Sequence, residues 1–420
     1  MTAILFISGL SLNDALRAAG RAHRKLFEDL GHEFIEISLA DPEALDSSLD
    51  TLNRTIKHQQ IELAYSAMGQ GAELAGRAPD GNDVNFWAAN RIPFISLNGD
   101  SPAYFFDRHV MPSRWHACLY FFPEHLEFRR RLPMTPALYG LIPPRPFDMV
   151  DKREIDFRKK EKGKLLFLKN GNDPEKLVRI WRDAMPAPTF IALTELAGAL
   201  VEGINAEIGC DIDAFVTAYF IDKGWDVGEL VNLRLFFVAQ LDDYLRRVKS
   251  SMVAEVLADF PVEIQGFNWE HMDFSRRRAT FLPGGDYTAS KQQIIDSLGI
   301  VDMSPNTQRA PHDRAMRAFG LCTLCLTNEQ RFFKDGFANF EMFSYRFEKD
   351  HLAGKVAEVL AHPKQYVELG LEVAEQFRKN RQPHDFAQFM LDTASYLRLA
   401  SGPRSPMLQG FFVWPPNKLQ

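Results

Sequence analysis

Short apolar runs that alternate with helical patterns limit this chain to the α/β class. The run AILFISG is followed by DALRAAGRAHRKLFEDLGH, in which apolar residues recur at helical spacing. The same order then repeats, with HEFIEISL before SLDTLNRTIKHQQ and with the runs IELAYSAMG, IPFISLNGD and ACLYFF after it. Strands that alternate with helices predict β-α-β units and a parallel sheet. The first 150 residues are therefore expected to form a Rossmann-like domain.

A second α/β region begins after a segment that breaks this alternation. Residues 141–164 are rich first in proline and then in charge, which is typical of a linker between domains. A strand and a glycine turn follow in KLLFLKNGND, and further strands are expected in VEIQGFN, RATFLPG, IIDSLGIVDMS and CTLCLT. We therefore predict one domain over residues 1–150 and a second over residues 151–395. Residues 396–420 are expected to pack back on the first domain.

A long helical stretch interrupts the second domain between about residues 194 and 259, with a break near residues 222–226. Its Leu and Phe side chains recur at helical spacing, which favours core or subunit packing over a ligand site. We expect a helical insertion there, through which copies of the chain could form a homo-oligomer. A cleft between two such α/β domains is where a small ligand would bind.

Net charge and hydropathy exclude several classes of partner. The chain has 420 residues and a formal net charge of -6, so no global basic field recruits nucleic acid. We interpret the local runs Arg129–Arg131 and Arg276–Arg278 as solvated surface charge. No stretch reaches the ~18 uncharged apolar residues of a membrane helix, and the N-terminus lacks the basic region of a signal peptide. A cytoplasmic protein without a transmembrane segment is expected.

A series of motifs between Val262 and Thr393 carries a family resemblance. QGFNW ends a strand in Gly-aromatic, FLPGGDYTASKQQIIDSLGI supplies a strand and a loop, and VDMSPNTQRAPHDRAMRAFGLCTLCLTNEQ reads as strand, turn and helix. An aromatic segment, FKDGFANFEMFSYRFE, and the helix KVAEVLAHPKQYVELGLEVAEQFRKN follow. This order resembles the C-terminal half of GT-B glycosyltransferases, above all the bacterial CgeB-type group and its relatives in the family-1 clan. The resemblance implies two Rossmann-like domains that face a cleft.

The resemblance also implies a bacterial enzyme that moves a sugar from a nucleotide-diphosphate sugar to an acceptor. The acceptor could be a glycan, a lipid-linked glycan or a protein, and the sequence does not choose among them. Two alternatives stay open, namely a non-catalytic GT-B-like ligand-binding or scaffold protein and a nucleotide-sugar epimerase of the same fold. The aromatic segment Phe332–Phe347 could contact such a partner.

The stretch NTQRAPHDRAMRAFG predicts a helix start that could hold an anion. Unpaired N–H groups and the helix dipole attract phosphate to such an end, where His312 and Arg314 would add donors. We expect Asp313 to cap the helix. In the family that the chain resembles, this helix points at the diphosphate of the donor, so Asn306, His312, Asp313 and Arg314 are predicted to bind it. A plain capped surface helix is the alternative.

Arg317 departs from the family pattern. The family usually has a Glu three residues after the Arg of this helix, where it holds hydroxyl groups of the donor sugar or ribose. In this chain that position is Arg317. We predict that Arg317 contacts the donor, and its positive charge would favour a donor with more phosphate or an acidic sugar. Loss of the Glu also supports the non-catalytic alternative.

Two other places complete the predicted donor site. Lys169 and Asn170 follow the first strand of the second domain, where family members place a basic residue against the diphosphate. The turn at Asn170-Gly171-Asn172 lets backbone amides approach a ligand. Tyr287 is expected to line the base or phosphate pocket. A strand-end lysine and a loop tyrosine without a role are the alternatives.

Catalysis is expected to need no metal and no other cofactor. The resemblance implies that the helix dipole and basic residues stabilise the leaving diphosphate, and the sequence shows no His-x-x-x-His spacing. Transfer with inversion needs a base, for which Asp14 and Asp100 are candidates because each follows a strand of the first domain. Asp14 also reads as a helix cap and Asp100 as a turn residue. A retaining enzyme would need neither.

Overall fold

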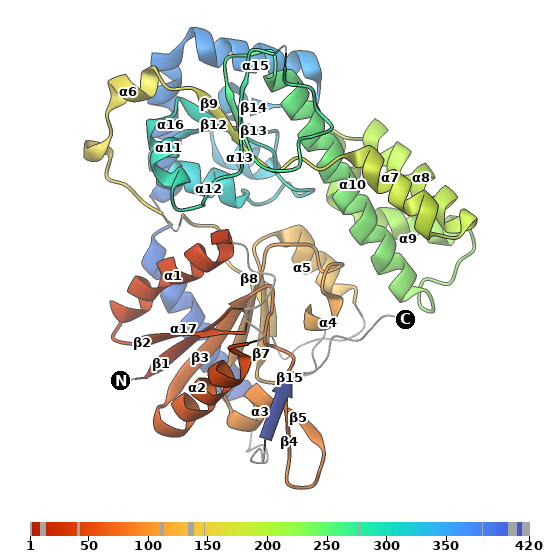
Figure 1. The fold of residues 1–420 in the computed structure, drawn as a ribbon, viewed down its shortest axis with the longest axis vertical. Helices are drawn as coiled ribbons and strands as arrows, with labels where there is room; N and C mark the ends of the chain where they lie inside the picture. The colour runs from red at the N-terminus through yellow and green to blue at the C-terminus, as the bar shows by residue number, and fades with distance from the viewer. Residues whose placement is uncertain are drawn as a thin grey trace. The chain divides into compact units, whose positions relative to one another are not determined.

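The computed structural model describes residues 2–8, 14–39, 43–109, 113–132, 138–146, 148–275, 277–379, 381–401 and 410–413. Packing divides the chain into two compact units, Met1–Phe147 with Arg381–Gln420, and Asp148–Asn380. Each unit is built on one six-stranded sheet (Figure 1). The chain leaves the first unit inside the predicted linker. It returns at Arg381, earlier than the predicted return at residue 396.

The first unit folds around a parallel sheet in the order β2-β1-β3-β6-β7-β8. Every residue of the interior strand β1 is buried, as expected where helices cover both faces of a parallel sheet. The strands are β1 (Ala3–Ser8), β2 (Glu33–Ser38), β3 (Ile61–Ala67), β6 (Phe94–Asn98), β7 (His116–Tyr120) and β8 (Leu138–Leu141). The helices are α1 (Asp14–Glu28), α2 (Leu45–His58), α3 (Phe86–Asn90), α4 (Phe106–His109), α5 (Pro123–Arg130) and α17 (Pro383–Ala400).

Two C-terminal elements belong to the first unit. Helix α17 buries Phe386, Met390 and Leu397 in the same core as residues of β1 and β3, and Arg398 forms an ion pair with Glu62. Strand β15 (Gly410–Val413) pairs antiparallel with β4 (Leu74–Arg77), which in turn pairs with β5 (Asp83–Asn85). The final helix is thus an integral part of the first core.

The second unit has a parallel sheet in the order β11-β10-β9-β12-β13-β14. By position along the chain this is the strand order 3-2-1-4-5-6 of a doubly wound fold. The strands are β9 (Leu165–Leu168), β10 (Glu263–Gln265), β11 (Thr280–Leu282), β12 (Gly299–Asp302), β13 (Leu324–Asn328) and β14 (Ser344–Tyr345). The strand order reverses between β9 and β12, and this reversal defines where a ligand is expected.

Helices surround this sheet and form the expected insertion. The insertion consists of α7 (Pro174–Ala184), α8 (Ala187–Glu202), α9 (Ile212–Asp222) and α10 (Val231–Leu257), which Figure 1 shows gathered beside one another. A buried ion pair, Arg234 Nε to Asp213 Oδ1 at 3.2 Å, ties α10 to α9. The other helices are α6 (Phe157–Glu161), α11 (Ser290–Asp296), α12 (Asp313–Gly320), α13 (Arg331–Gly336), α14 (Phe340–Phe343), α15 (Lys349–Ala361) and α16 (Pro363–Arg378).

Two local predictions were wrong. The run IIDSLGIVDMS does not form one strand, because its first residues end helix α11 and only Gly299–Asp302 pair in the sheet. In the aromatic segment Phe332–Phe347, the side chains of Phe333, Phe337 and Phe343 are buried in the core, and a contact of this segment with a partner stays a prediction. Arg129 is fully buried rather than solvated, and its Nε donates to the carbonyl oxygen of His109 at 2.9 Å.

Candidate functional site

The carboxyl ends of β9 and β12 form the place where the second sheet reverses its strand order. The connections that leave two such strands run to opposite sides, so a crevice opens at their carboxyl ends and commonly holds the ligand. Lys169 follows β9 directly, and Asp302 is the last residue of β12. Topology alone therefore singles out these two side chains.

Lys169 carries an ammonium group without a partner among the residues that the structure describes. Burial lowers the pKa of Lys169 to about 8, and the nearby charges of Arg314 and Arg246 act in the same direction. Its backbone is fixed on both sides, because its N–H donates to the Gln265 carbonyl at 3.0 Å and its carbonyl accepts from Trp269 Nε1 at 2.9 Å. The position of Lys169 is thus rigid while its charge is uncompensated.

Gly266 allows the ends of β9 and β10 to lie this close together. A Cβ atom at Gly266 would lie 2.0 Å from the carbonyl oxygen of Lys169, so any side chain there would push the two strand ends apart. The neighbouring Asn170 uses its side-chain oxygen to accept from the Phe267 N–H at 3.0 Å. Asn170 therefore shapes the turn, and its predicted contact with the donor stays a prediction.

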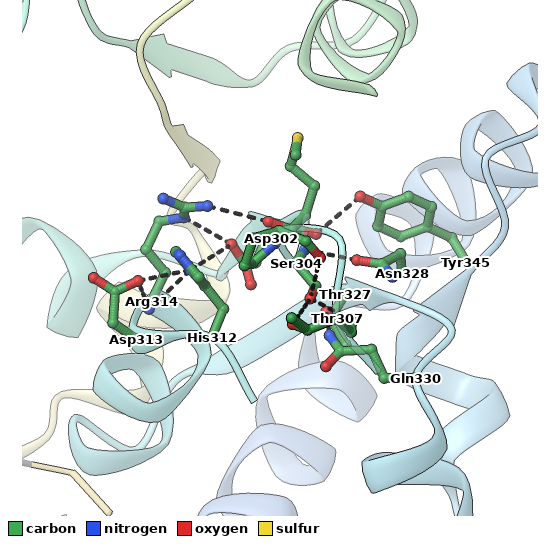
Figure 2. A network of polar contacts seen from close by, with 12 residues as sticks. Asp302, Ser304, Thr307, His312, Asp313, Arg314, Thr327, Asn328, Gln330 and Tyr345 are labelled. Carbon is green, nitrogen blue, oxygen red and sulfur yellow. Dashed lines mark hydrogen bonds and ion pairs between the residues drawn. The ribbon is translucent and has the colours of Figure 1, made fainter. Parts of the chain in front are cut away.

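Asp302 is the centre of a polar cluster at the start of α12 (Figure 2). Its side chain is fully buried, and Oδ1 accepts from Arg314 Nε at 2.7 Å. A second N–H of Arg314 donates to the Met303 carbonyl at 3.1 Å. Burial alone would raise the pKa of Asp302, but the charges of Arg314 and His312 outweigh it, so the pKa is lowered. Asp302 is therefore ionised and holds Arg314 against the strand end.

The helix cap lies one residue earlier than predicted. His312 occupies the N-cap position, and Asp313 is the first helical residue. The His312 ring nitrogen Nδ1 lies 2.6 Å from the Asp313 carboxylate and must donate to it, so it cannot also accept from the Arg314 N–H at 3.5 Å. That N–H instead donates to Asp313 Oδ1 at 2.8 Å. Burial opposes protonation of His312, but Asp313 and Asp302 together raise its pKa.

The charges of this cluster largely cancel. Arg314 is paired with Asp302, and His312 is paired with Asp313, which is two-thirds exposed. Both cations predicted to face phosphate already have internal acceptors, so they add little net positive charge. Their contact with a donor stays a prediction, and Lys169 beside them has no carboxylate at ion-pair distance in the described part of the chain.

Arg317 lies one turn further along α12, and its side chain is used for contacts within the protein. Its side chain donates from Nη2 to the Tyr287 carbonyl at 2.6 Å, from Nη1 to Ser290 Oγ at 2.9 Å, and pairs from Nε with Asp148 at 3.2 Å. The guanidinium also lies 3.7 Å from the centre of the Tyr287 ring, and burial raises the pKa of the Tyr287 hydroxyl. Arg317 therefore holds the Tyr287 loop in place.

Asn306 is anchored to the helical insertion. Its Nδ2 donates to Asp242 Oδ1 at 2.8 Å, and its Oδ1 accepts from Lys249 Nζ at 2.9 Å. Asp242 and Lys249 both belong to α10. The amide of Asn306 is thus occupied at both ends, which favours a role in positioning the loop between β12 and α12.

The two candidate bases lie in the first unit. Asp14 is the first residue of α1, and its side chain is outside the described part of the chain. Asp100 is half-buried in the loop after β6, next to a turn in which the Ser101 carbonyl accepts from the Tyr104 N–H at 2.9 Å. The assignment of either residue as a base stays a prediction.

Asp302, Arg246 and Lys249 were missed by the sequence reasoning. Asp302 had a visible signal, because it is the acidic residue that ends the strand in GIVDMS. No sequence signal marked Arg246 and Lys249, because a helical pattern does not show which distant loop the helix packs against. Within the described ranges, no group of three His, Cys, Asp or Glu residues could hold a metal ion, and no helix is long and apolar enough to cross a membrane.

Comparisons with known proteins identify the fold but not a sequence family. No family model and no curated protein matches the sequence. An α-glucosyltransferase solved with UDP-glucose and DNA containing an abasic site has a TM-score of 0.52 at 9% identity, over 94% of this chain and 99% of that chain. Its likeness, together with the two parallel sheets, confirms the predicted GT-B fold of two Rossmann-like domains.

Two further solved structures cover a similar share of the chain. A DNA-modifying β-glucosyltransferase has a TM-score of 0.48 at 8% identity, over 93% of this chain and 99% of that chain. A glycosyltransferase from Rickettsia africae ESF-5 has a TM-score of 0.46 at 10% identity, over 94% of this chain and 98% of that chain. The neighbours are glycosyltransferases, and identities this low speak for the fold alone.

Proposed function

We propose that this protein is a glycosyltransferase that takes a sugar from a nucleotide-diphosphate sugar and transfers it to an acceptor. The observation that carries the proposal is the ammonium of Lys169, which is half-buried and without a partner among the described residues at the strand reversal of the second sheet. Its neighbours Asp302 and Arg314 are already paired with each other. An anionic ligand is the group that would compensate the remaining charge.

A diphosphate suits this place for a physical reason. Keeping an ammonium ionised away from water costs free energy unless an opposite charge lies beside it. A bound phosphate would supply that charge, and the N-terminus of α12 would add oriented backbone dipoles. The same groups would stabilise the negative charge that develops on a leaving diphosphate during transfer. A site of this kind needs no metal, and metal independence is part of the proposal.

For the catalytic base we propose two candidate residues, and for the acceptor only classes of molecule. Asp14 and Asp100 remain the proposed bases because both lie at carboxyl ends of first-unit strands. We propose a glycan, a lipid-linked glycan or a protein as acceptor. Nucleic acid was excluded on the net charge of -6, but two of the neighbours act on or were solved with DNA, so the fold does not support that exclusion. The CgeB-type group, the bacterial origin and the cytoplasmic location stay predictions.

Ligand binding and turnover together test the proposal. The purified protein is mixed with UDP, GDP, TDP and CMP sugars, and the melting temperature and the release of free nucleotide are measured. We expect one nucleotide diphosphate to stabilise the protein and its sugar conjugate to be hydrolysed slowly. Lys169→Ala should weaken that binding about tenfold or more, because it removes a charge-assisted contact. Lys164→Ala is the control, since Lys164 is half-exposed and paired with Glu263.

The outcomes separate the alternatives. Stabilisation by none of the nucleotides, or equal affinity in Lys169→Ala and the wild type, would contradict the donor site. Binding without release of nucleotide or change of the sugar would favour the non-catalytic alternative. Interconversion of two nucleotide sugars would favour an epimerase.

A further inference from the structure

Helix α10 of the insertion covers the strand reversal of the second sheet. Its residues Asp242 and Lys249 both hydrogen-bond the side chain of Asn306, in the loop after β12. Arg247, on the same stretch, donates from Nη1 to the carbonyl of Asp173 at 3.1 Å, in the loop after β9. The helix is therefore attached to both loops that leave the crevice, and its position there is fixed by side chains.

Arg246 lies between these attachment points. Its Nε pairs with Asp242 Oδ2 at 2.9 Å, one helical turn away, and its side chain is 22% exposed. Asp242 in turn receives the amide of Asn306, so the carboxylate orients the guanidinium relative to the loop after β12. Arg246 is also close enough to Lys169 for its charge to oppose protonation of that ammonium.

The charges around the crevice leave an excess of cations. Arg246 is matched by Asp242, Arg314 by Asp302, and His312 by Asp313. Among the described residues, Lys169 and Lys249 have no carboxylate at ion-pair distance, and Lys249 donates to the neutral amide of Asn306. Lys249 is buried beneath the Phe347 ring, so Lys169 is the ammonium of this pair that can meet a ligand, and its charge favours an anion.

We propose that Arg246 binds the diphosphate of the donor together with Lys169, so that the helical insertion forms one wall of the donor site. This proposal rests on the proposed function and names a residue for it. A guanidinium can present two parallel N–H groups to phosphate oxygens, which an ammonium cannot. Asp242 orients Arg246, and a helix held by Asn306 and Asp173 gives the guanidinium a rigid base.

Binding of inorganic pyrophosphate tests the proposal without knowledge of the nucleotide or the sugar. Affinity is measured by calorimetry for the wild type, Arg246→Ala, Arg246→Lys and Lys355→Ala. Lys355 is the control, because it has a similar exposure of 19% and a carboxylate partner on its own helix, Glu358, but lies on α15 and contacts neither loop of the crevice. Arg246→Ala should weaken binding about tenfold, Arg246→Lys should restore part of the loss, and Lys355→Ala should stay within about twofold.

Hydrogen exchange on the wild-type protein gives a reading that does not depend on any variant. Pyrophosphate should slow amide exchange in residues 242–250 of α10 as well as in the loop after β9. Unchanged exchange in α10, or wild-type affinity in Arg246→Ala, would overturn this proposal. The proposed function would still stand if Lys169→Ala bound pyrophosphate more weakly than the wild type. Failure of the wild type to bind both pyrophosphate and every nucleotide diphosphate would instead overturn the donor site as a whole.

Discussion

Arg314 Nε donates to Asp302 Oδ1 at 2.7 Å, so the first turn of α12 is tied to the end of β12 by its own side chains. Without this pair the guanidinium would be the obvious partner for an anion at the helix start. With it, the charges at the helix end largely cancel, and among the described residues Lys169, close by, has no carboxylate at ion-pair distance. The pair thus holds Arg314 against the strand end, and Lys169 supplies a net positive charge for the donor.

Replacing Asp302 should reveal how strongly this pair supports the fold. Asp302→Asn keeps the size of the side chain but removes the negative charge that neutralises Arg314. The guanidinium would then face a fully buried neutral amide. We expect a loss of about 3 kcal/mol in the free energy of unfolding, measured by urea denaturation. The matched control is Asp313→Asn, whose side chain is 67% exposed and should cost about 1 kcal/mol or less. Equal losses in both variants would contradict a structural role for the buried pair.

The role of Arg317 can be tested with Arg317→Glu, which introduces the acidic residue that the resembled family usually has at this position. Arg317→Glu would place a carboxylate against Asp148 and the Tyr287 carbonyl, in a site that is 8% exposed for the side chain. We expect it to lower the free energy of unfolding by about 3 kcal/mol or more and to give no gain in donor affinity. Arg331→Glu is the control, because Arg331 is 60% exposed. Tighter nucleotide-sugar binding in Arg317→Glu would show that the position still serves the donor.

Most strands could be predicted from the sequence, because a buried strand appears there as a run of apolar residues. The buried run Ala3–Ser8 and the buried run Leu165–Leu168 could each be placed as the first strand of a sheet. Local pattern failed where a tertiary contact decided the structure. Residues 290–296 form a helix whose apolar residues Ile294 and Ile295 pack on the core, although the same residues suit a strand.

The location of the site could be predicted from the sequence, but not which of its charged side chains have a counter-charge. Lys169, His312 and Arg314 could be assigned to strand and helix ends that meet at one edge of the sheet. Which cations are compensated depends on Asp302 and Asp242, whose side chains come from β12 and from the distant helix α10. Spacing along the chain holds no information on such pairs, so the difference between Lys169 and Arg314 could not be predicted.

Anion binding should take up a proton at alkaline pH. The pKa of Lys169 is lowered to about 8 in the ligand-free protein, and a bound phosphate would raise it again. At pH 9 the free lysine is mostly neutral, so binding of pyrophosphate should be accompanied by uptake of up to about one proton. Calorimetry in buffers of different ionisation enthalpy measures this number. Lys169→Met should reduce the uptake, and unchanged uptake would show that another group titrates.

The stability of the ligand-free protein should rise with pH between 8 and 10.5. Burial lowers the pKa of Lys160, Lys169 and Lys249 to about 8 in each case, from the ordinary lysine value of 10.5. Between these two values the unfolded chain binds more protons than the folded one, so deprotonation favours the folded state, and below pH 8 the full cost of the buried charges is present.

Urea denaturation at pH 8 and at pH 10 should therefore show a gain of about 2 kcal/mol for each of the three lysines, about 6 kcal/mol together, in the free energy of unfolding at the higher pH. Lys169→Met removes one of the three groups and should flatten the slope, whereas Lys164→Met, at a half-exposed and paired lysine, should leave it unchanged. Saturating pyrophosphate should flatten it as well, because the bound anion restores the charge of Lys169. A wild-type protein whose stability falls over this range would contradict the buried, uncompensated state of these lysines.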